Sequence, residues 1–171
     1  MAERRRSLLA GLSGPVLEVG AGDGLSLRHY PASVTRVLAV EPEPTLRRRA
    51  EALGPADMSI KAAVASLVLC SVADQDAALR ELHRVIEPGG QLRFLEHVRA
   101  DTPGMARVQR ALDTTIWPHL AGGCHVGRDT VGAIRRAGVR VKRLDRFRFP
   151  DARTPSSLHV LGTAIRGPAI A

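Results

Sequence analysis

The sequence has few aromatic residues and few cysteines, and both shortages limit what the protein can be. Aromatic side chains account for 3% of the residues, so we expect an aliphatic core and few rings on which nucleic-acid bases could stack. Cys70 and Cys124 are the only cysteines. Two cysteines fit a reducing compartment, and because their spacing is not that of metal ligands, we expect no bound metal.

Long apolar runs are also missing. No run reaches the roughly 18 residues that a membrane-spanning helix needs, so we expect no membrane span. The N-terminus is basic, but the apolar stretch at 7–12 is too short for a signal peptide, and the predicted location is therefore cytoplasmic. The composition, 44% hydrophobic and 25% charged, predicts one globular domain over residues 1–171.

The charge is unbalanced, with a formal net value of +8. One interpretation is binding to nucleic acid or another polyanion. The other is compositional, because Lys61 and Lys142 are the only lysines and the remaining basic residues are arginines, as in a GC-rich genome. The basic residues are scattered along the chain, which favours the second interpretation, and we do not expect a nucleic-acid partner.

Predicted strands and helices alternate along the chain. Strands are predicted at 16–19, 34–40, 62–70, 91–98, 139–144 and 158–165, the last two as a possible hairpin. Helices are predicted at 1–13, 25–30, 44–53, 75–86, 105–116 and 129–137, and Pro88-Gly89-Gly90 is expected to form a sharp turn. This alternation predicts an α/β fold with a doubly wound, mostly parallel sheet, whose ligand lies at the carboxyl ends of the strands.

A glycine turn follows the first predicted strand, with Gly20, Gly22 and Gly24 at every second position. The third glycine comes one residue too early for a dinucleotide fingerprint, but a strand, a glycine turn and a helix start still predict a nucleotide-binding corner. Glu41 ends the second predicted strand, where its carboxylate could accept hydrogen bonds from both ribose hydroxyls. The expected ligand is of adenosine type.

Glu18 is an acidic residue inside the first apolar strand. Burial of a carboxylate is costly unless it is paired or hydrogen-bonded. A cationic group of the ligand, or backbone amides of the glycine turn, could offset that cost. A purely structural role for Glu18 remains equally open from the sequence.

Several motifs occur in an order that resembles the class I S-adenosylmethionine-dependent methyltransferases, in particular the type-11 branch that includes the methyltransferase-like 7 thiol methyltransferases. The motifs are the 16–24 turn, Glu41, Leu67-Val68-Leu69-Cys70-Ser71-Val72, Pro88-Gly89-Gly90, Glu96-His97 and Gly123-Cys124-His125. The resemblance covers nearly the whole chain. It implies a Rossmann-like fold, S-adenosyl-L-methionine as cofactor and S-adenosyl-L-homocysteine as product.

The resemblance also implies where the cofactor would bind. The stretch from Glu18 to Gly22 would hold its methionine part, Glu41 its ribose hydroxyls, and Ser66-Leu67 would line the pocket. The cofactor-binding residues expected on this basis are Glu18, Gly20, Ala21, Gly22, Glu41, Pro42, Ser66, Leu67 and Ser71.

The chain departs from the family after Glu41. Members usually carry a third strand and an acidic turn that binds adenine, but Arg49 stands where that acid would be, and only 20 residues separate Pro42 from Lys61 inclusively. One strand–helix unit is therefore expected to be deleted, which would leave the second strand as a bare sheet edge. Bare edges pair with other chains, so we expect a homodimer through this edge.

Methyl transfer mainly requires alignment, and a base only where the acceptor carries a proton. His97 and His125 are the expected catalytic bases, with His119 and Asp113 as further candidates. Apolar side chains at Met105, Trp117 and Leu120 predict a small, lipophilic acceptor, a thiol or another small molecule. Three alternatives stay open: a catalytically impaired dimerising protein, a basic nucleic-acid-binding module, and a hydrolase that uses neighbouring Cys124 and His125.

Overall fold

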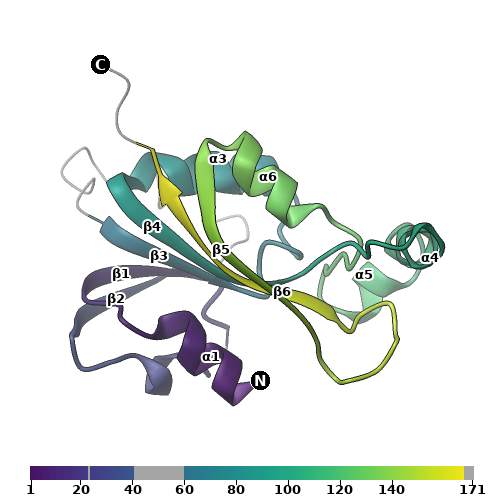
Figure 1. Cartoon of the computed structure of the whole chain (residues 1–171), viewed down its shortest axis with the longest axis horizontal. Helices are drawn as coiled ribbons and strands as arrows, with labels where there is room; N and C mark the ends of the chain where they lie inside the picture. Colours follow the sequence, from purple (N-terminus) through teal and green to yellow (C-terminus); the bar gives the residue numbers. More distant parts are fainter. Residues whose placement is uncertain (23, 41–59, 168–171) are drawn as a thin grey trace.

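The computed structural model describes residues 1–22, 24–40 and 60–167. Within them, six strands form one sheet in the order β2-β1-β3-β4-β6-β5, shown in Figure 1. The strands are β1 (Gly14–Val19), β2 (Val34–Val40), β3 (Ile60–Ser66), β4 (Ile86–His97), β5 (Val139–Arg148) and β6 (Leu158–Arg166). Strands β2, β1, β3 and β4 run parallel, whereas β6 is antiparallel to both β4 and β5. The mostly parallel α/β sheet is therefore confirmed, as is the antiparallel pairing of the last two strands.

Helices cover both faces of this sheet. They are α1 (Ala2–Leu9), the 3-10 helix η1 (Leu27–His29), α3 (Gln75–Val85), α4 (Pro103–Asp113), α5 (Trp117–Leu120) and α6 (Thr130–Arg136). In Figure 1, α1 lies on one face, α3 and α6 lie on the other, and α4 and α5 lie beyond the end of the sheet. Helices on both faces make the sheet doubly wound.

Each face of the sheet has its own apolar core. Leu8, Leu9 and Leu12 pack on one face with Val16 and Val64. The larger cluster on the other face is built from alternate strand residues and from α3 and α6; it includes Leu17, Val19, Leu79, Leu82, Phe94 and Ile134. Phe94 is the one aromatic ring among the fully buried large side chains, so the core is aliphatic as expected.

Three predicted elements differ in the structure. The segment between Gly24 and Pro31 forms only the 3-10 helix η1, because a stretch this short cannot offset the cost of nucleating an α-helix before proline stops it. The strand predicted over 62–70 ends at Ser66, because Leu67 adopts a left-handed φ of 57°. Pro88-Gly89-Gly90 lies inside β4, where the register with β3 shifts and Gly89 has a φ of +82°, so the predicted turn is an irregularity within the strand.

The edge strand is β2, which pairs with β1 alone among the described residues. Glu41, Pro42, Arg49 and the helix predicted at 44–53 lie outside the described residues, and so does most of the segment in which the deletion is expected. In the described part of the chain, every helix is too short or too polar to cross a membrane.

Candidate functional site

The glycine turn after β1 touches the loop that follows β3. A Cβ added to Gly20 would lie 2.5 Å from Cγ2 of Val68, and Gly20 also has a φ of +68°, which favours glycine. The Gly20 amide donates a hydrogen bond to the carbonyl of Val40 at 2.7 Å. Gly20 therefore brings the carboxyl ends of β1, β2 and β3 together, where the sequence predicted a ligand.

Glu18 is buried in the middle of the sheet, with 1% of its surface exposed. It pairs with Ala39 and Val64 in the neighbouring strands. The Tyr30 hydroxyl donates a hydrogen bond to Oε2 of Glu18 at 3.2 Å. Burial, followed by the charge of Glu18, raises the pKa of Tyr30, so the tyrosine remains a neutral donor. Sequence analysis missed Tyr30, whose only signal was its place at the end of the first crossover.

Glu96 holds the loop after β3. Its fully buried carboxylate accepts hydrogen bonds from the amides of Val68 at 3.1 Å, Leu69 at 3.0 Å and Cys70 at 3.1 Å. Burial raises the pKa of Glu96, and these three amide hydrogen bonds oppose that rise. The sequence indicated Glu96 only as part of a motif, and its three backbone partners lie 26–28 residues away.

Ser66 and Leu67 begin that loop. Ser66 is the last residue of β3 and is half-buried, and the amide of Leu67 donates to the carbonyl of Leu95 at 2.7 Å. Ser71 lies at the far end of the same loop, with its Oγ 3.6 Å from Sγ of Cys70. The three predicted residues of this loop therefore share one segment, which Gly20 contacts at Val68.

Cys70, His97 and Cys124 form a cluster, although they come from three separate parts of the chain. Sγ of Cys124 lies 3.5 Å from Sγ of Cys70 and 3.4 Å from Nδ1 of His97. Sγ of Cys70 lies 3.8 Å from the same Nδ1 atom. The amide of His125 donates to the carbonyl of Cys70 at 2.8 Å, which fastens the 121–126 loop to the loop after β3.

The two thiols of this cluster differ in acidity. The hydrogen bond with Cys124, together with burial, raises the pKa of Cys70 to about 12. The same hydrogen bond lowers the pKa of Cys124, against the opposing effect of burial. Cys124 is therefore the thiol that ionises more easily.

His159 stacks against the cluster, with its ring centroid 4.2 Å from that of His97. It is 2% exposed, and its Nδ1 lies 2.8 Å from the carbonyl of Ser157. Burial lowers the pKa of His159 to about 4, so the imidazole is neutral near pH 7. Sequence analysis did not single out His159.

The structure separates the two histidines predicted as bases. His97 lies in the cluster with both cysteines, whereas Nδ1 of His125 lies 2.8 Å from the carbonyl of its own neighbour Gly123. Cys124 thus has His97 within hydrogen-bonding distance. The adjacency of Cys124 and His125 in the sequence had instead suggested that these two residues form a pair.

The helix α4 is anchored by a buried amide. Gln109 is fully buried, and its side-chain nitrogen donates to carbonyls 2.9–3.2 Å away on three segments, at Val98, Val126 and Pro155. Its oxygen accepts from the amide of Ala100 at 2.7 Å.

The apolar side chains of Val108, in α4, and Ile116, just after it, are largely solvent-accessible. Val108 is 47% and Ile116 is 55% exposed. The residue of α4 that is buried is the polar Gln109, because the segments packed against the helix present backbone carbonyls and an amide that its side chain binds. Asp113 adds to this contact by accepting from the amides of Val126 and Gly127, both at 2.8 Å.

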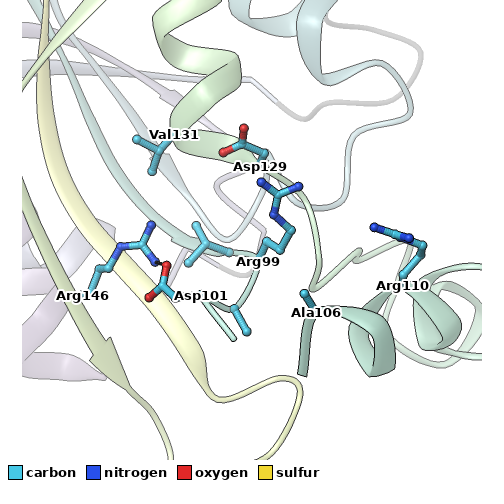
Figure 2. A pocket seen from close by; sticks show the side chains of 9 residues that line it. Arg99, Asp101, Ala106, Arg110, Asp129, Val131 and Arg146 are labelled. Atoms are coloured by element: carbon cyan, nitrogen blue, oxygen red, sulfur yellow. Dashed lines mark hydrogen bonds and ion pairs between the residues drawn. The ribbon is translucent and has the colours of Figure 1, made fainter. Parts of the chain in front are cut away.

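A polar cavity of about 370 Å³ lies between the segment after β4, α4, α6 and β5, as Figure 2 shows. It is lined by Val98, Arg99, Ala100, Asp101, Ala106, Arg110, Asp129, Val131 and Arg146. Arg146 donates to Asp101 at 2.8 Å across it. None of the residues predicted from the sequence lines this cavity, and its charged wall differs from the apolar acceptor side that was expected.

Comparison with known proteins gives the family. Residues 1–141 match the family model described as a methyltransferase domain. Thiol S-methyltransferase TMT1A of Homo sapiens is 30% identical to this chain, and the match covers 97% of this chain and 80% of that protein. Thiol S-methyltransferase TMT1B of Mus musculus is 35% identical, over 92% of this chain and 74% of that protein.

Solved structures share the fold. Geranyl diphosphate methyltransferase, solved in complex with S-adenosylmethionine, superimposes with a TM-score of 0.64 over 96% of this chain and 84% of that chain, at 16% identity. An identity this low speaks to the fold alone, which is the Rossmann-like arrangement that the motifs implied. The chain therefore belongs to the methyltransferase-domain family and is an S-adenosylmethionine-dependent methyltransferase.

Proposed function

We propose that this protein transfers the methyl group of S-adenosyl-L-methionine to the sulfur of a small, lipophilic thiol. The observation that carries this proposal is the match to thiol S-methyltransferases at 30–35% identity over most of the chain. The apolar surface expected for a lipophilic acceptor is present in part. Trp117 packs half-buried beside Cys70 and Cys124, and Leu120 is 73% exposed, so apolar surface is present next to the cluster.

The cofactor is proposed to bind at the carboxyl ends of β1 and β3. Its methionine part would lie against Glu18, Gly20, Ala21 and Gly22, and the loop of Ser66, Leu67 and Ser71 would line the other side. Support comes from the close approach of Gly20 to Val68, which places the turn and the loop against each other. Glu41 and Pro42, which fall outside the described residues, are proposed to contact the ribose.

The chemistry asks little of the protein. The methyl carbon leaves a sulfonium, so the leaving group is a neutral thioether and the main requirement is alignment of the two sulfur atoms with that carbon. A thiol acceptor must also lose its proton. We assign the role of base to His97, since it is half-buried at the end of β4 beside Cys70 and Cys124, and we keep His125 as the second candidate.

Calorimetry with S-adenosyl-L-homocysteine and an assay of methyl transfer to a small alkyl thiol test the proposal. We expect measurable heat of binding and formation of the methyl thioether. Glu41→Ala is expected to abolish the heat of binding while circular dichroism of the variant stays unchanged. If no heat of binding is measured at high micromolar S-adenosyl-L-homocysteine, the enzyme assignment is overturned. If S-adenosyl-L-homocysteine binds but no thiol is methylated, the acceptor assignment is overturned.

We further propose that residues 1–171 act as one unit, as a homodimer in the cytoplasm. The edge position of β2 supports the dimer. Six of its seven residues, all except Val40, are at least partly exposed, and among the described residues its side away from β1 has no paired strand. Light scattering tests this directly. A mass of 18.3 kDa, that of one chain, would rule the dimer out.

A further inference from the structure

We propose that Cys70, His97 and Cys124 bind a thiophilic divalent metal ion, zinc in the first instance, and that the acceptor thiol occupies the position these three ligands leave open. The metal site stands on geometry alone. Its use for a thiol rests on the proposed function. It also revises the expectation from sequence, in which the spacing of the two cysteines spoke against a metal.

The ligand atoms have the separations that a tetrahedral zinc ion requires. Zinc–sulfur bonds of about 2.3 Å and zinc–nitrogen bonds of about 2.0–2.1 Å at tetrahedral angles place two sulfurs about 3.8 Å apart, and a sulfur and a nitrogen about 3.5 Å apart. The observed distances are 3.5 Å for Cys70 to Cys124, 3.4 Å for Cys124 to His97, and 3.8 Å for Cys70 to His97. Each observed separation lies within about 0.3 Å of the tetrahedral value.

The ligands are also preorganised. The carboxylate of Glu96 accepts a hydrogen bond from the Cys70 amide and so fixes the backbone of Cys70. The hydrogen bond from the His125 amide to the Cys70 carbonyl fixes the loop that carries Cys124. His97 ends β4, whose pairing with β6 reaches that residue. A metal site needs its ligands held in place by such supporting contacts, because positions that are free to move lose affinity.

The set of ligands is that of a site with one open position. Within the described residues, the group of candidate ligands whose atoms lie close together contains these three side chains and no carboxylate or fourth thiol. Structural zinc sites have four protein ligands, whereas sites that act on a substrate have three. The soft sulfur ligands favour zinc over magnesium or calcium, which prefer oxygen.

An open position on a zinc ion suits a thiol acceptor. A thiol that coordinates such an ion loses its proton to solvent, so a base is no longer needed. The acceptor sulfur would then form a bond to the methyl carbon while the bond between that carbon and the sulfonium sulfur breaks, releasing S-adenosyl-L-homocysteine as a neutral thioether. In this arrangement His97 holds the metal and does not accept the proton.

Cobalt(II) in place of zinc provides the test, because thiolate ligands give it a strong charge-transfer absorption and tetrahedral coordination gives visible bands. We expect the metal-free full chain to bind one equivalent with both features. Cys70→Ser, Cys124→Ser and His97→Gln are each expected to reduce or abolish them. His119→Gln, which removes an exposed histidine, is the matched control and is expected to leave them unchanged.

A measurement on the unmodified chain guards against variants that fail to fold. Zinc is expected to protect both cysteines from alkylation under native conditions, and a chelator is expected to restore their reactivity. A folded chain that shows neither the cobalt spectrum nor this protection would overturn the metal site.

The role in catalysis has its own readout. Addition of a small thiol to the cobalt form is expected to change the visible bands, whereas the corresponding alcohol is not. Unchanged methyl transfer after complete removal of metal would overturn this role while the proposed function stands. A cobalt form that takes up the thiol but never methylates it would leave the metal site in place and refute the proposed function instead.

Discussion

The sheet and the loops around it are built differently. In the first half of the sheet, β1, β2 and β3 supply apolar side chains to both faces, and Gly20 makes the close contact between the turn after β1 and the loop after β3. In the loops around its carboxyl edge, Glu96, Gln109 and Asp113 hold the chain through hydrogen bonds to backbone groups. Apolar patterning thus builds the sheet, and buried polar side chains place the loops that surround its carboxyl edge.

The sharpest test of this contrast is on α4. Gln109→Leu keeps the volume similar but leaves three carbonyls and one amide without their partner, so we expect a loss of stability of about 4 kcal/mol in urea unfolding. Val108→Ala, one residue away on the exposed surface, is expected to change stability by less than about 0.5 kcal/mol. The opposite ranking would mean that the helix is held by its apolar face after all.

Gly20→Ala tests the contact between the turn after β1 and the loop after β3. The new Cβ would meet the Val68 side chain at 2.5 Å and would occupy a left-handed conformation, so we expect a loss of about 3 kcal/mol and weakened binding of S-adenosyl-L-homocysteine in calorimetry. Gly22→Ala is the control. It also has a positive φ, of +52°, but no atom lies within 4 Å of the added Cβ, so its cost is limited to about 1 kcal/mol of backbone strain. Equal effects would show that strain, and not the approach to Val68, makes glycine necessary.

Glu96→Gln tests how much the buried carboxylate contributes to the free energy of unfolding. The amide that replaces it presents an NH2 group to backbone donors, so at least one of the three hydrogen bonds is lost and we expect a cost of about 2–3 kcal/mol. Hydrogen exchange is expected to speed up at the amides of Val68 to Cys70. Glu81→Gln removes a partly exposed carboxylate paired with Arg84 and is expected to cost no more than about 1 kcal/mol. If exchange at the 68–70 amides stays slow, Glu96 does not order that loop.

His159 gives the smallest predicted effect, which depends on pH. Its folded-state pKa of about 4 lies below the ordinary histidine value of 6.5, so the unfolded chain binds more protons between these values. Stability is therefore full above pH 6.5 and falls as the pH drops toward 4, by an amount on the order of 2 kcal/mol. His159→Phe is expected to remove this part of the slope in urea unfolding at a series of pH values. Identical slopes for the two chains would contradict a neutral, buried imidazole.

The predictable parts of the fold are those with a local signal. The β-branched run at 34–40 matched β2 at both ends, because β-branched residues favour strands. Its predicted burial was wrong, since β2 is the edge strand and Val40 alone in it is buried. The last two strands were also predicted as a hairpin, and the glycine turn after β1 is in place. In each of these cases, neighbouring residues alone determine the local conformation.

The site was harder to predict because its contacts join distant residues. Cys70 and Cys124 touch across 54 positions of sequence, and no short motif records that distance. Spacing rules for metal ligands assume that two ligands share one loop, and here the three side chains come from two separate loops and the end of a strand. Gln109 was hidden for a similar reason, since its partners are backbone groups that leave no trace in the sequence.

The neighbouring residues Glu96 and His97 both contact Cys70, one at its backbone and one at its side chain. The carboxylate of Glu96 binds the backbone of Cys70, while the ring of His97 lies 3.8 Å from the sulfur of the same residue. Any displacement of β4 along its axis therefore carries the main chain and the side chain of Cys70 together. Rotation of the Cys70 side chain would separate its sulfur from the histidine ring, whereas the main chain would stay bound to Glu96.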